Sequence, residues 1–110
     1  MRYEIVFAPE AVSDLRQLKA NLRVAVRDEI ERHLRHEPRK VSKSRIKRLR
    51  GLSQPQYRLR MEDVRVLYDV TERTVEILAI VDKAEAEAWL TKSARPEAKR
   101  EDADETSGTF

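Results

Sequence analysis

Three arginines, Arg58, Arg60 and Arg65, stand within one short stretch of the chain, YRLRMEDVRVLYDV. β-forming residues alternate on either side of a Glu-Asp pair, which is typical of two antiparallel strands joined by a two-residue turn. In that register Arg60 lies opposite Arg65, and Arg58 lies opposite Leu67, on one face. Like charges directly opposite each other destabilise a sheet by roughly 0.2–1 kcal/mol. A bound anion would relieve the repulsion, and phosphate matches the fork of arginine donors.

The alternative is that these arginines are solvated or paired with nearby acids, of which the chain offers Glu62, Asp63, Asp69 and Glu76. Three converging cations beside a basic segment favour the anion site. From Arg39 to Arg60 the chain has nine Lys or Arg residues and no acid, whereas Glu101–Glu105 is acidic. The basic segment is either a solvated loop or a contact for nucleic acid. The candidate RNA contacts within it are Lys43, Arg45, Lys47, Arg48 and Arg50.

Other chemistry is sparse. The chain has no cysteine, which excludes a disulfide scaffold and a thiolate metal site. Its two histidines, His33 and His36, stand together near the end of an expected helix, where we interpret them as surface residues. We therefore expect no metal, no small-molecule cofactor and no membrane segment, and a cytoplasmic protein.

The elements that position these residues follow from periodicity. We expect a strand over Arg2–Ala8, a helix from Pro9, and a second helix capped by Asn21. The second helix has an apolar stripe formed by Leu22, Val26, Ile30 and Leu34. The basic segment is a loop with a short edge strand near Ile46–Leu49. Three antiparallel strands, Gln56–Met61, Val64–Val70 and Thr74–Asp82, precede a short helix over Lys83–Thr91 with a capping box from Asp82 to Glu85.

This pattern predicts an α+β fold, in which a helical hairpin packs on one face of an antiparallel meander. Two-residue turns would place Val66 opposite Ala79 and Val64 opposite Val81 on the covered face. The other face would then hold the arginines beside an exposed apolar floor of Leu67, Leu78 and Ile80. We expect one domain over residues 1–92 and a disordered polar tail over residues 93–110.

Four segments, YEIVFAPEAVSDLRQL, KRLRGL, YRLRMEDVRVLY and VEILAIVDKAEAEAW, resemble the RelE/ParE superfamily of toxins from type II toxin–antitoxin systems. The resemblance covers Arg2 to about Leu90. It implies the same order of elements and a cognate antitoxin as partner. In the RelE branch it implies a ribosome-dependent endonuclease, in which the ribose 2′-hydroxyl of mRNA attacks the adjacent phosphate and translation is inhibited.

By motif position the resemblance implies catalytic roles for Arg58, Arg60, Arg65 and Lys83. Lys83 stands where the RelE branch has an arginine, and Trp89 stands where it has a functional tyrosine. Lysine lacks the bidentate fork, and tryptophan can stack on an RNA base but has no hydroxyl. These departures leave two alternatives open: a gyrase inhibitor of the ParE kind without nuclease activity, or an RNA- or ribosome-binding homologue that does not cleave.

Cleavage would also need a proton acceptor for the 2′-hydroxyl, and arginine is a poor general base because it stays protonated. Asp63, Asp69 and Asp82 are the candidates, and the residues alone do not choose among them. A weak enzyme of this kind would depend on the ribosome to position its substrate.

Overall fold

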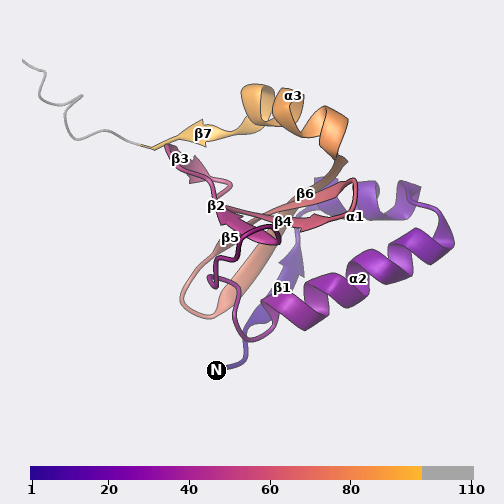
Figure 1. The fold of residues 1–110 in the computed structure, drawn as a ribbon, viewed down its shortest axis with the longest axis horizontal. Coiled ribbons are helices and arrows are strands. Elements are labelled where there is room, and N and C mark those ends of the chain that lie inside the picture. The colour runs from indigo at the N-terminus through magenta and orange to yellow at the C-terminus, as the bar shows by residue number, and fades with distance from the viewer. Residues whose placement is uncertain (98–110) are drawn as a thin grey trace, which may run out of the picture.

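The computed structural model describes residues 1–97 and has a mixed α+β fold (Figure 1). The predicted order of elements and fold class are confirmed. The elements are β1 (Glu4–Phe7), α1 (Pro9–Gln17), α2 (Ala20–Leu34), β2 (Ile46–Arg48), β3 (Leu52–Gln54), β4 (Tyr57–Met61), β5 (Val64–Val70), β6 (Thr74–Asp82), α3 (Lys83–Ser93) and β7 (Arg95–Pro96).

The main sheet has five strands in the order β1-β6-β5-β4-β2. The central meander of β4, β5 and β6 is antiparallel, as predicted, and β2 adds an antiparallel edge strand where a short one was expected. β1 pairs with β6 in parallel at one edge of the sheet, and the helical hairpin carries the chain across to β2 at the opposite edge. The basic segment is therefore tied to the sheet through β2.

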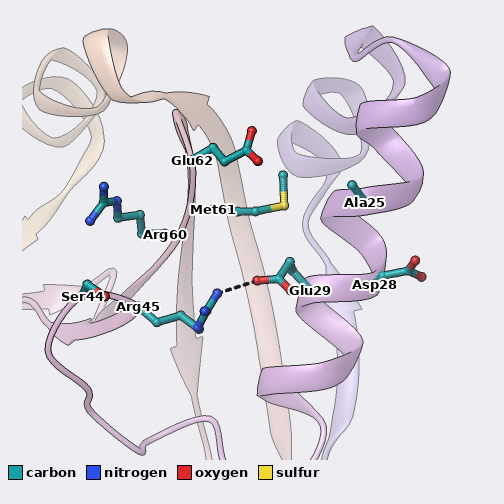
Figure 2. Close-up of a pocket in the computed structure, with 8 residues that line it drawn as sticks. All are labelled: Ala25, Asp28, Glu29, Ser44, Arg45, Arg60, Met61 and Glu62. Carbon is teal, nitrogen blue, oxygen red and sulfur yellow. Dashed lines mark hydrogen bonds and ion pairs between the residues drawn. The ribbon is translucent and has the colours of Figure 1, made fainter.

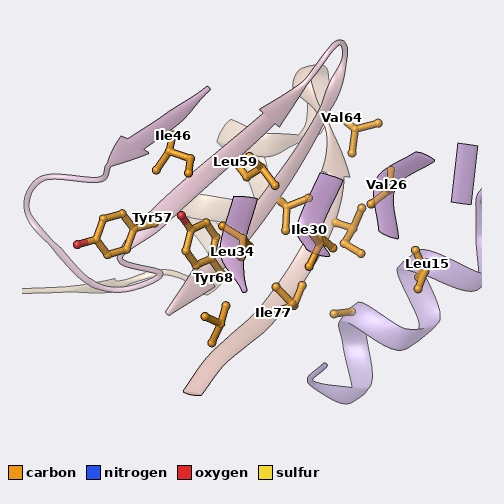
Figure 3. Packing of buried hydrophobic residues seen from close by; sticks show 14 of the residues in the cluster. Leu15, Val26, Ile30, Leu34, Ile46, Tyr57, Leu59, Val64, Tyr68 and Ile77 are labelled. Carbon is orange, nitrogen blue, oxygen red and sulfur yellow. The ribbon is translucent and has the colours of Figure 1, made fainter. Parts of the chain in front are cut away.

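The hydrophobic core lies between this sheet and the hairpin of α1 and α2 (Figure 3). The predicted stripe of α2 supplies Val26, Ile30 and Leu34, which are all buried. They pack against inward side chains of the meander such as Leu59 and Tyr68, which are fully buried. Truncating a buried leucine of this kind to alanine costs about 2–5 kcal/mol. This face therefore has a structural role.

Two of the three helices lack the N-terminal caps that the sequence predicted. Pro9 starts α1, where its missing N–H costs nothing. Asn21 does not cap α2: Lys19 holds the cap position, and the Asn21 side chain accepts a hydrogen bond from the Leu22 N–H at 2.9 Å. Asp82 precedes α3 but makes no side-chain cap bond, so the expected capping box is absent. No helix within residues 1–97 combines the length and apolar composition needed to cross a membrane.

A β-bulge in β6 overturns part of the predicted register. Val70 and Val75 pair as expected, and so do Tyr68 and Ile77, but Val66 then pairs with Ile80. The extra residue moves Ile80 into the core and turns Val81 toward the side of Arg65. The expected floor is therefore wrong: Leu67 is only 1% exposed, Ile80 belongs to the core, and Leu78 is half-buried.

α3 and the two-stranded sheet of β3 and β7 complete the fold. Figures 1 and 2 place α3 on the opposite side of the sheet from α2, and α3 packs against β5 and β6. Arg95–Pro96 pairs with β3, and the Glu97 N–H donates to the Gly51 carbonyl at 2.8 Å. These residues lie in the predicted disordered tail, so that interpretation is wrong for residues 93–97, and residues 98–110 lie outside the described part.

Candidate functional site

Four cations share one face of the sheet, opposite the helical hairpin. Arg60 is the direct partner of Arg65 across β4 and β5, and Lys47 is the partner of Arg58 across β2 and β4. The side chains between them, such as Leu59, point into the core, so these four point the other way. We call Lys47, Arg58, Arg60 and Arg65 the cation face. The predicted pairing of Arg60 with Arg65 is confirmed.

Arg58 is the most constrained side chain of the cation face. It is half-buried, and its Nε atom is buried without a hydrogen-bond partner. Its Nη2 reaches only the Ser44 carbonyl, at a long 3.4 Å. Burial lowers the pKa of Arg58, and the charges of Arg65 and Arg60 lower it further. Arg58 is thus a cation in a position that disfavours positive charge, which an anion would compensate.

Arg65 has a different environment from the one expected. Its side chain is only 7% exposed, and its Nη1 donates to the carbonyls of Glu62 at 2.6 Å and Val64 at 3.1 Å. It therefore holds the β4–β5 turn, in which Glu62 has a φ of 53°. Part of the guanidinium is structural, and only the remaining N–H groups can meet an anion.

The alternative interpretation, in which nearby acids pair with the arginines of the cation face, does not hold in the described residues. Within residues 1–97, the ion pairs involve Arg32, His33, Arg35, Lys40 and Arg45, and none involves the cation face. Glu62 meets Arg65 through its backbone carbonyl, and its carboxylate is exposed. The repulsion between Arg60 and Arg65 is therefore left uncompensated by protein carboxylates in this part of the chain.

The predicted RNA contacts of the basic segment divide into two groups. Lys47 joins the cation face, and Lys43 and Arg50 are exposed. Arg45 instead forms an ion pair with Glu29 of α2 at 2.8 Å. Arg48 donates to the Leu49 and Gln56 carbonyls and lies 5.4 Å from the ring centre of Tyr57. Arg45 and Arg48 therefore anchor the segment to the domain.

Lys83 and Trp89 come from α3 and point to different neighbours. The Lys83 N–H donates to the Asp63 carbonyl at 2.6 Å, which places the start of α3 beside the turn that Arg65 holds. The exposed Lys83 side chain lines a hollow of about 310 Å³ with Asp63 and Asp82. Trp89 donates its Nε1–H to Glu10 of α1 at 2.8 Å. Its polar edge is thus engaged with the helical hairpin.

The candidate proton acceptors are also separated by the fold. Asp69 is nearly buried, and its two oxygens accept bonds from the Gln54 side chain and the Gln56 N–H, both at 2.8 Å. Asp69 is therefore committed to holding β3 against β5. Asp63 and Asp82 share the hollow beside Lys83 and remain the candidates.

The two histidines lie at the end of α2. His33 Nε2 is 3.5 Å from Glu29, and burial lowers the pKa of His33 although the Glu29 charge acts in the opposite direction. His36 Nδ1 lies 3.2 Å from the Met1 carbonyl oxygen. Neither contacts the cation face. Within residues 1–97 no group of three or more His, Asp or Glu side chains could hold a metal ion.

Sequence reasoning missed a second hollow, of about 620 Å³, between α2 and the end of β4 (Figure 2). We call it the α2–β4 hollow. It is lined by Ala25, Asp28 and Glu29 of α2, Ser44 and Arg45 of the basic segment, and Arg60, Met61 and Glu62. Its residues come from three separate segments, so no local pattern could have indicated it.

Sequence reasoning also missed Asp14. Its carboxylate accepts a 2.9 Å hydrogen bond from the Ile80 N–H, beyond the point where β1 has ended and left β6 without a neighbour. Burial raises the pKa of Asp14, and its bond from Ile80 acts in the opposite direction. A helix residue that completes a bulged strand 66 positions away leaves no signal in the local sequence.

Comparisons with known proteins agree with this fold. Residues 5–87 match the family model described as ParE toxin of type II toxin-antitoxin system, parDE. The toxin–antitoxin complex RelBE2 of Mycobacterium tuberculosis is 28% identical over 74% of this chain and 99% of that chain, with a TM-score of 0.59. The RelE–RelB complex of Pyrococcus horikoshii is 26% identical over 76% of this chain and 97% of that chain, with a TM-score of 0.56.

A third solved structure, a mutant of the E. coli toxin RelE in the free state, has a TM-score of 0.64. It covers 81% of this chain and 92% of that chain at 18% identity, which supports the fold alone. Comparison with curated proteins gives no match.

Proposed function

We propose a molecular activity for this chain, which belongs to the ParE toxin family, within the RelE/ParE superfamily. It is a toxin of a type II toxin–antitoxin system. The proposed activity is ribosome-dependent cleavage of mRNA. In this reaction the ribose 2′-oxygen bonds to the adjacent phosphorus, and the bond from that phosphorus to the 5′-oxygen breaks.

The observation that carries this proposal is the cation face. Arg60 lies opposite Arg65 without a compensating carboxylate in the described residues, and Arg58 is crowded by both. A phosphate bound here would gain charge-assisted hydrogen bonds and remove the mutual repulsion. As the phosphorane forms, its added negative charge would strengthen the same contacts, which is how fixed cations lower such a barrier.

Proton transfer would take place beside the cation face. Asp63 or Asp82 would accept the proton of the 2′-hydroxyl, and Lys83, which shares their hollow, would donate a proton to the leaving 5′-oxygen. Arg65 would hold the β4–β5 turn and, through it, the backbone of Lys83. The proton-transfer groups Asp63, Asp82 and Lys83 are exposed, so we expect the ribosome to position the RNA.

We further propose that a cognate antitoxin binds this chain. The similar structures from Mycobacterium tuberculosis and Pyrococcus horikoshii are toxin–antitoxin complexes. Arg58, Arg60 and Lys47 would attract an acidic segment of such a partner. Because Leu67 and Ile80 are buried, charge rather than an apolar floor would guide the partner to this face.

Gyrase inhibition is the second candidate function. The matching family model is described as ParE toxin, and Trp89 is bonded to Glu10, away from a role in proton transfer. The chain would then bind its target without cleaving RNA. A third candidate, RNA or ribosome binding without cleavage, would use the same cation face with Lys83 in place of the arginine of the RelE branch.

One expression experiment separates these candidates. The chain is produced briefly in cells, and both mRNA ends and chromosomal DNA breaks are mapped. Codon-phased mRNA ends that disappear in Arg60→Ala support the nuclease. The matched control is Arg73→Ala, which removes an exposed arginine from the turn between β5 and β6. DNA breaks without phased mRNA ends favour gyrase inhibition and contradict the nuclease.

A further inference from the structure

We infer that the α2–β4 hollow is a binding subsite for one nucleobase of an RNA whose phosphate lies on the cation face, and that it favours bases with an exocyclic amino group. The inference rests on the proposed function, because it needs RNA on the cation face. It adds a site and a base preference that the proposed cleavage does not itself require.

The position of Arg60 links the two sites. Arg60 is part of the cation face and also lines the hollow. β2 begins at Ile46, opposite Leu59, and the Arg60 N–H still donates to the Arg45 carbonyl at 2.8 Å, so the neighbouring segment ends beside β4 just before Met61. Figure 2 shows the Arg60 side chain on one side of β4 and Met61 on the other, pointing toward Ala25. A nucleotide whose phosphate meets Arg60 can therefore place its base around this edge.

The walls of the hollow suit the flat faces of a base. Met61 and Ala25 present apolar surface from opposite sides. Arg45 is held in place by its 2.8 Å ion pair with Glu29, so its planar guanidinium is fixed at the wall. Unpaired bases bind to proteins by stacking on such planar and apolar groups. A volume of about 620 Å³ is ample for one base.

The polar groups of the hollow include three carboxylates, which accept hydrogen bonds, beside the guanidinium groups of Arg45 and Arg60. Glu29 is already occupied by Arg45. The exposed carboxylate of Glu62 is the one drawn near Met61, whereas Asp28 lines the α2 side of the hollow with its carboxylate directed outward (Figure 2). Carboxylates accept from the amino groups of cytosine, adenine and guanine. Uracil has no amino group, and its single edge donor, the N3–H, lies between two carbonyl oxygens that a carboxylate repels. The same carboxylates repel phosphate, so the backbone would stay at Arg60 and the base would enter the hollow.

Cytosine and uracil provide the sharpest test, because they match in size and differ in this group. Short single-stranded oligo(C) and oligo(U) with 2′-O-methyl riboses cannot be cleaved, so their affinity is independent of catalysis. Fluorescence anisotropy at one fixed salt concentration gives both dissociation constants. We expect the wild type to bind oligo(C) about fivefold more tightly than oligo(U), the low end for a base-edge contact because the hollow is open.

Two double variants complete the test. Asp28→Asn with Glu62→Gln should bring the ratio of the two affinities to about one, because amides can also donate to uracil. Glu72→Gln with Glu87→Gln makes the same change in charge at exposed positions outside the hollow and should keep the fivefold ratio.

The outcomes distinguish the inference from the proposed function. Equal affinity of the wild type for both oligonucleotides, or a ratio that survives Asp28→Asn with Glu62→Gln, overturns the subsite and leaves the cation face standing. If neither oligonucleotide binds, or if Arg60→Ala binds both as tightly as the wild type, RNA binding at the cation face fails and the subsite fails with it.

Discussion

Arg60 and Arg65 are direct partners across β4 and β5, yet their environments are opposite. Arg60 is exposed, whereas Arg65 is buried and donates to the carbonyls of the turn that joins the two strands. Arg65 is therefore a cation fixed by hydrogen bonds, whereas the Arg60 side chain is free to change its conformation. This asymmetry decides which of the two can be replaced without harming the fold.

Arg60→Ala should raise stability while it abolishes function. Removing Arg60 ends the repulsion with Arg65, which is worth roughly 0.2–1 kcal/mol, and breaks no hydrogen bond of the described side chains. Urea unfolding measures the gain, and growth inhibition on expression measures the loss. Arg65→Ala should instead destabilise the protein, because the turn carbonyls lose their donor. Equal destabilisation by both variants would contradict the difference in their roles.

The arginine pair also shows how far sequence reasoning reaches. The register of β4 and β5 follows from a two-residue turn and alternation, so the partners of Arg60 and Arg58 could be predicted. The burial of Arg65 could not, because it depends on where α3 lies and on a turn carbonyl. The clustering of the arginines was thus predictable from the sequence. That Arg65 is buried and bonded to the turn while Arg60 is exposed was not.

The bulge in β6 is the second feature that the sequence did not predict. Alternation predicted Val66 opposite Ala79, but one extra residue moved Ile80 into the core. A bulge is stabilised by distant groups, here the Asp14 carboxylate from α1, and has no signature in a run such as ILAIV. The bulge explains why Ile80 is absent from the predicted apolar floor. Leu67 keeps its predicted partner Arg58, so its burial has a separate cause on the side of the sheet where α3 packs.

Asp14→Ala should lower the free energy of unfolding by about 1–3 kcal/mol, because the Ile80 N–H loses its acceptor. Asp14→Asn keeps a side-chain oxygen at the same place and should recover most of that loss. Thermal and urea unfolding of the three proteins measure this order. If alanine and asparagine destabilise equally, the hydrogen bond to Ile80 is not what makes Asp14 important.

Asp14 should also make the stability of the protein depend on pH. Burial raises the pKa of Asp14 in the folded state above its usual 3.8, so the folded protein holds this proton more tightly than the unfolded chain. Stability from this source is present below pH 3.8 and is lost as the pH rises through the folded-state pKa. Relative to Asp14→Asn, the wild type should therefore lose stability as the pH rises through this window. A difference between the two proteins that stays constant with pH would contradict the raised pKa.

Glu62→Gly should stabilise the protein by about 0.5–1 kcal/mol. Glu62 has a φ of 53°, a left-handed conformation that strains residues with a Cβ but not glycine. The relief is partly offset by the greater freedom of glycine in the unfolded chain. Asp63→Gly in the same turn is the control: Asp63 is not strained in this way, so glycine there should only destabilise. Urea unfolding of both variants should give changes of opposite sign.

The last prediction concerns Lys83, whose ammonium shares a hollow with Asp63 and Asp82 beside the turn that Arg65 holds. If Lys83 donates a proton to the leaving oxygen, Lys83→Gln should slow cleavage by roughly 10²–10⁴-fold, the usual effect of losing an acid–base group. Lys83→Arg keeps the charge and adds a bidentate fork, so it should hold the phosphorane at least as well but donate a proton poorly.

Single-turnover cleavage of mRNA in programmed ribosomes separates these contributions. A slow Lys83→Gln with an active Lys83→Arg would assign Lys83 to charge stabilisation, and slow cleavage by both would assign it to proton donation. Lys92→Gln, an exposed lysine near the end of α3, controls for the loss of one positive charge. Because the Lys83 backbone N–H, not its side chain, binds Asp63, neither substitution should disturb the start of α3. Wild-type rates for Lys83→Gln would therefore show that Lys83 begins a helix and takes no part in the reaction.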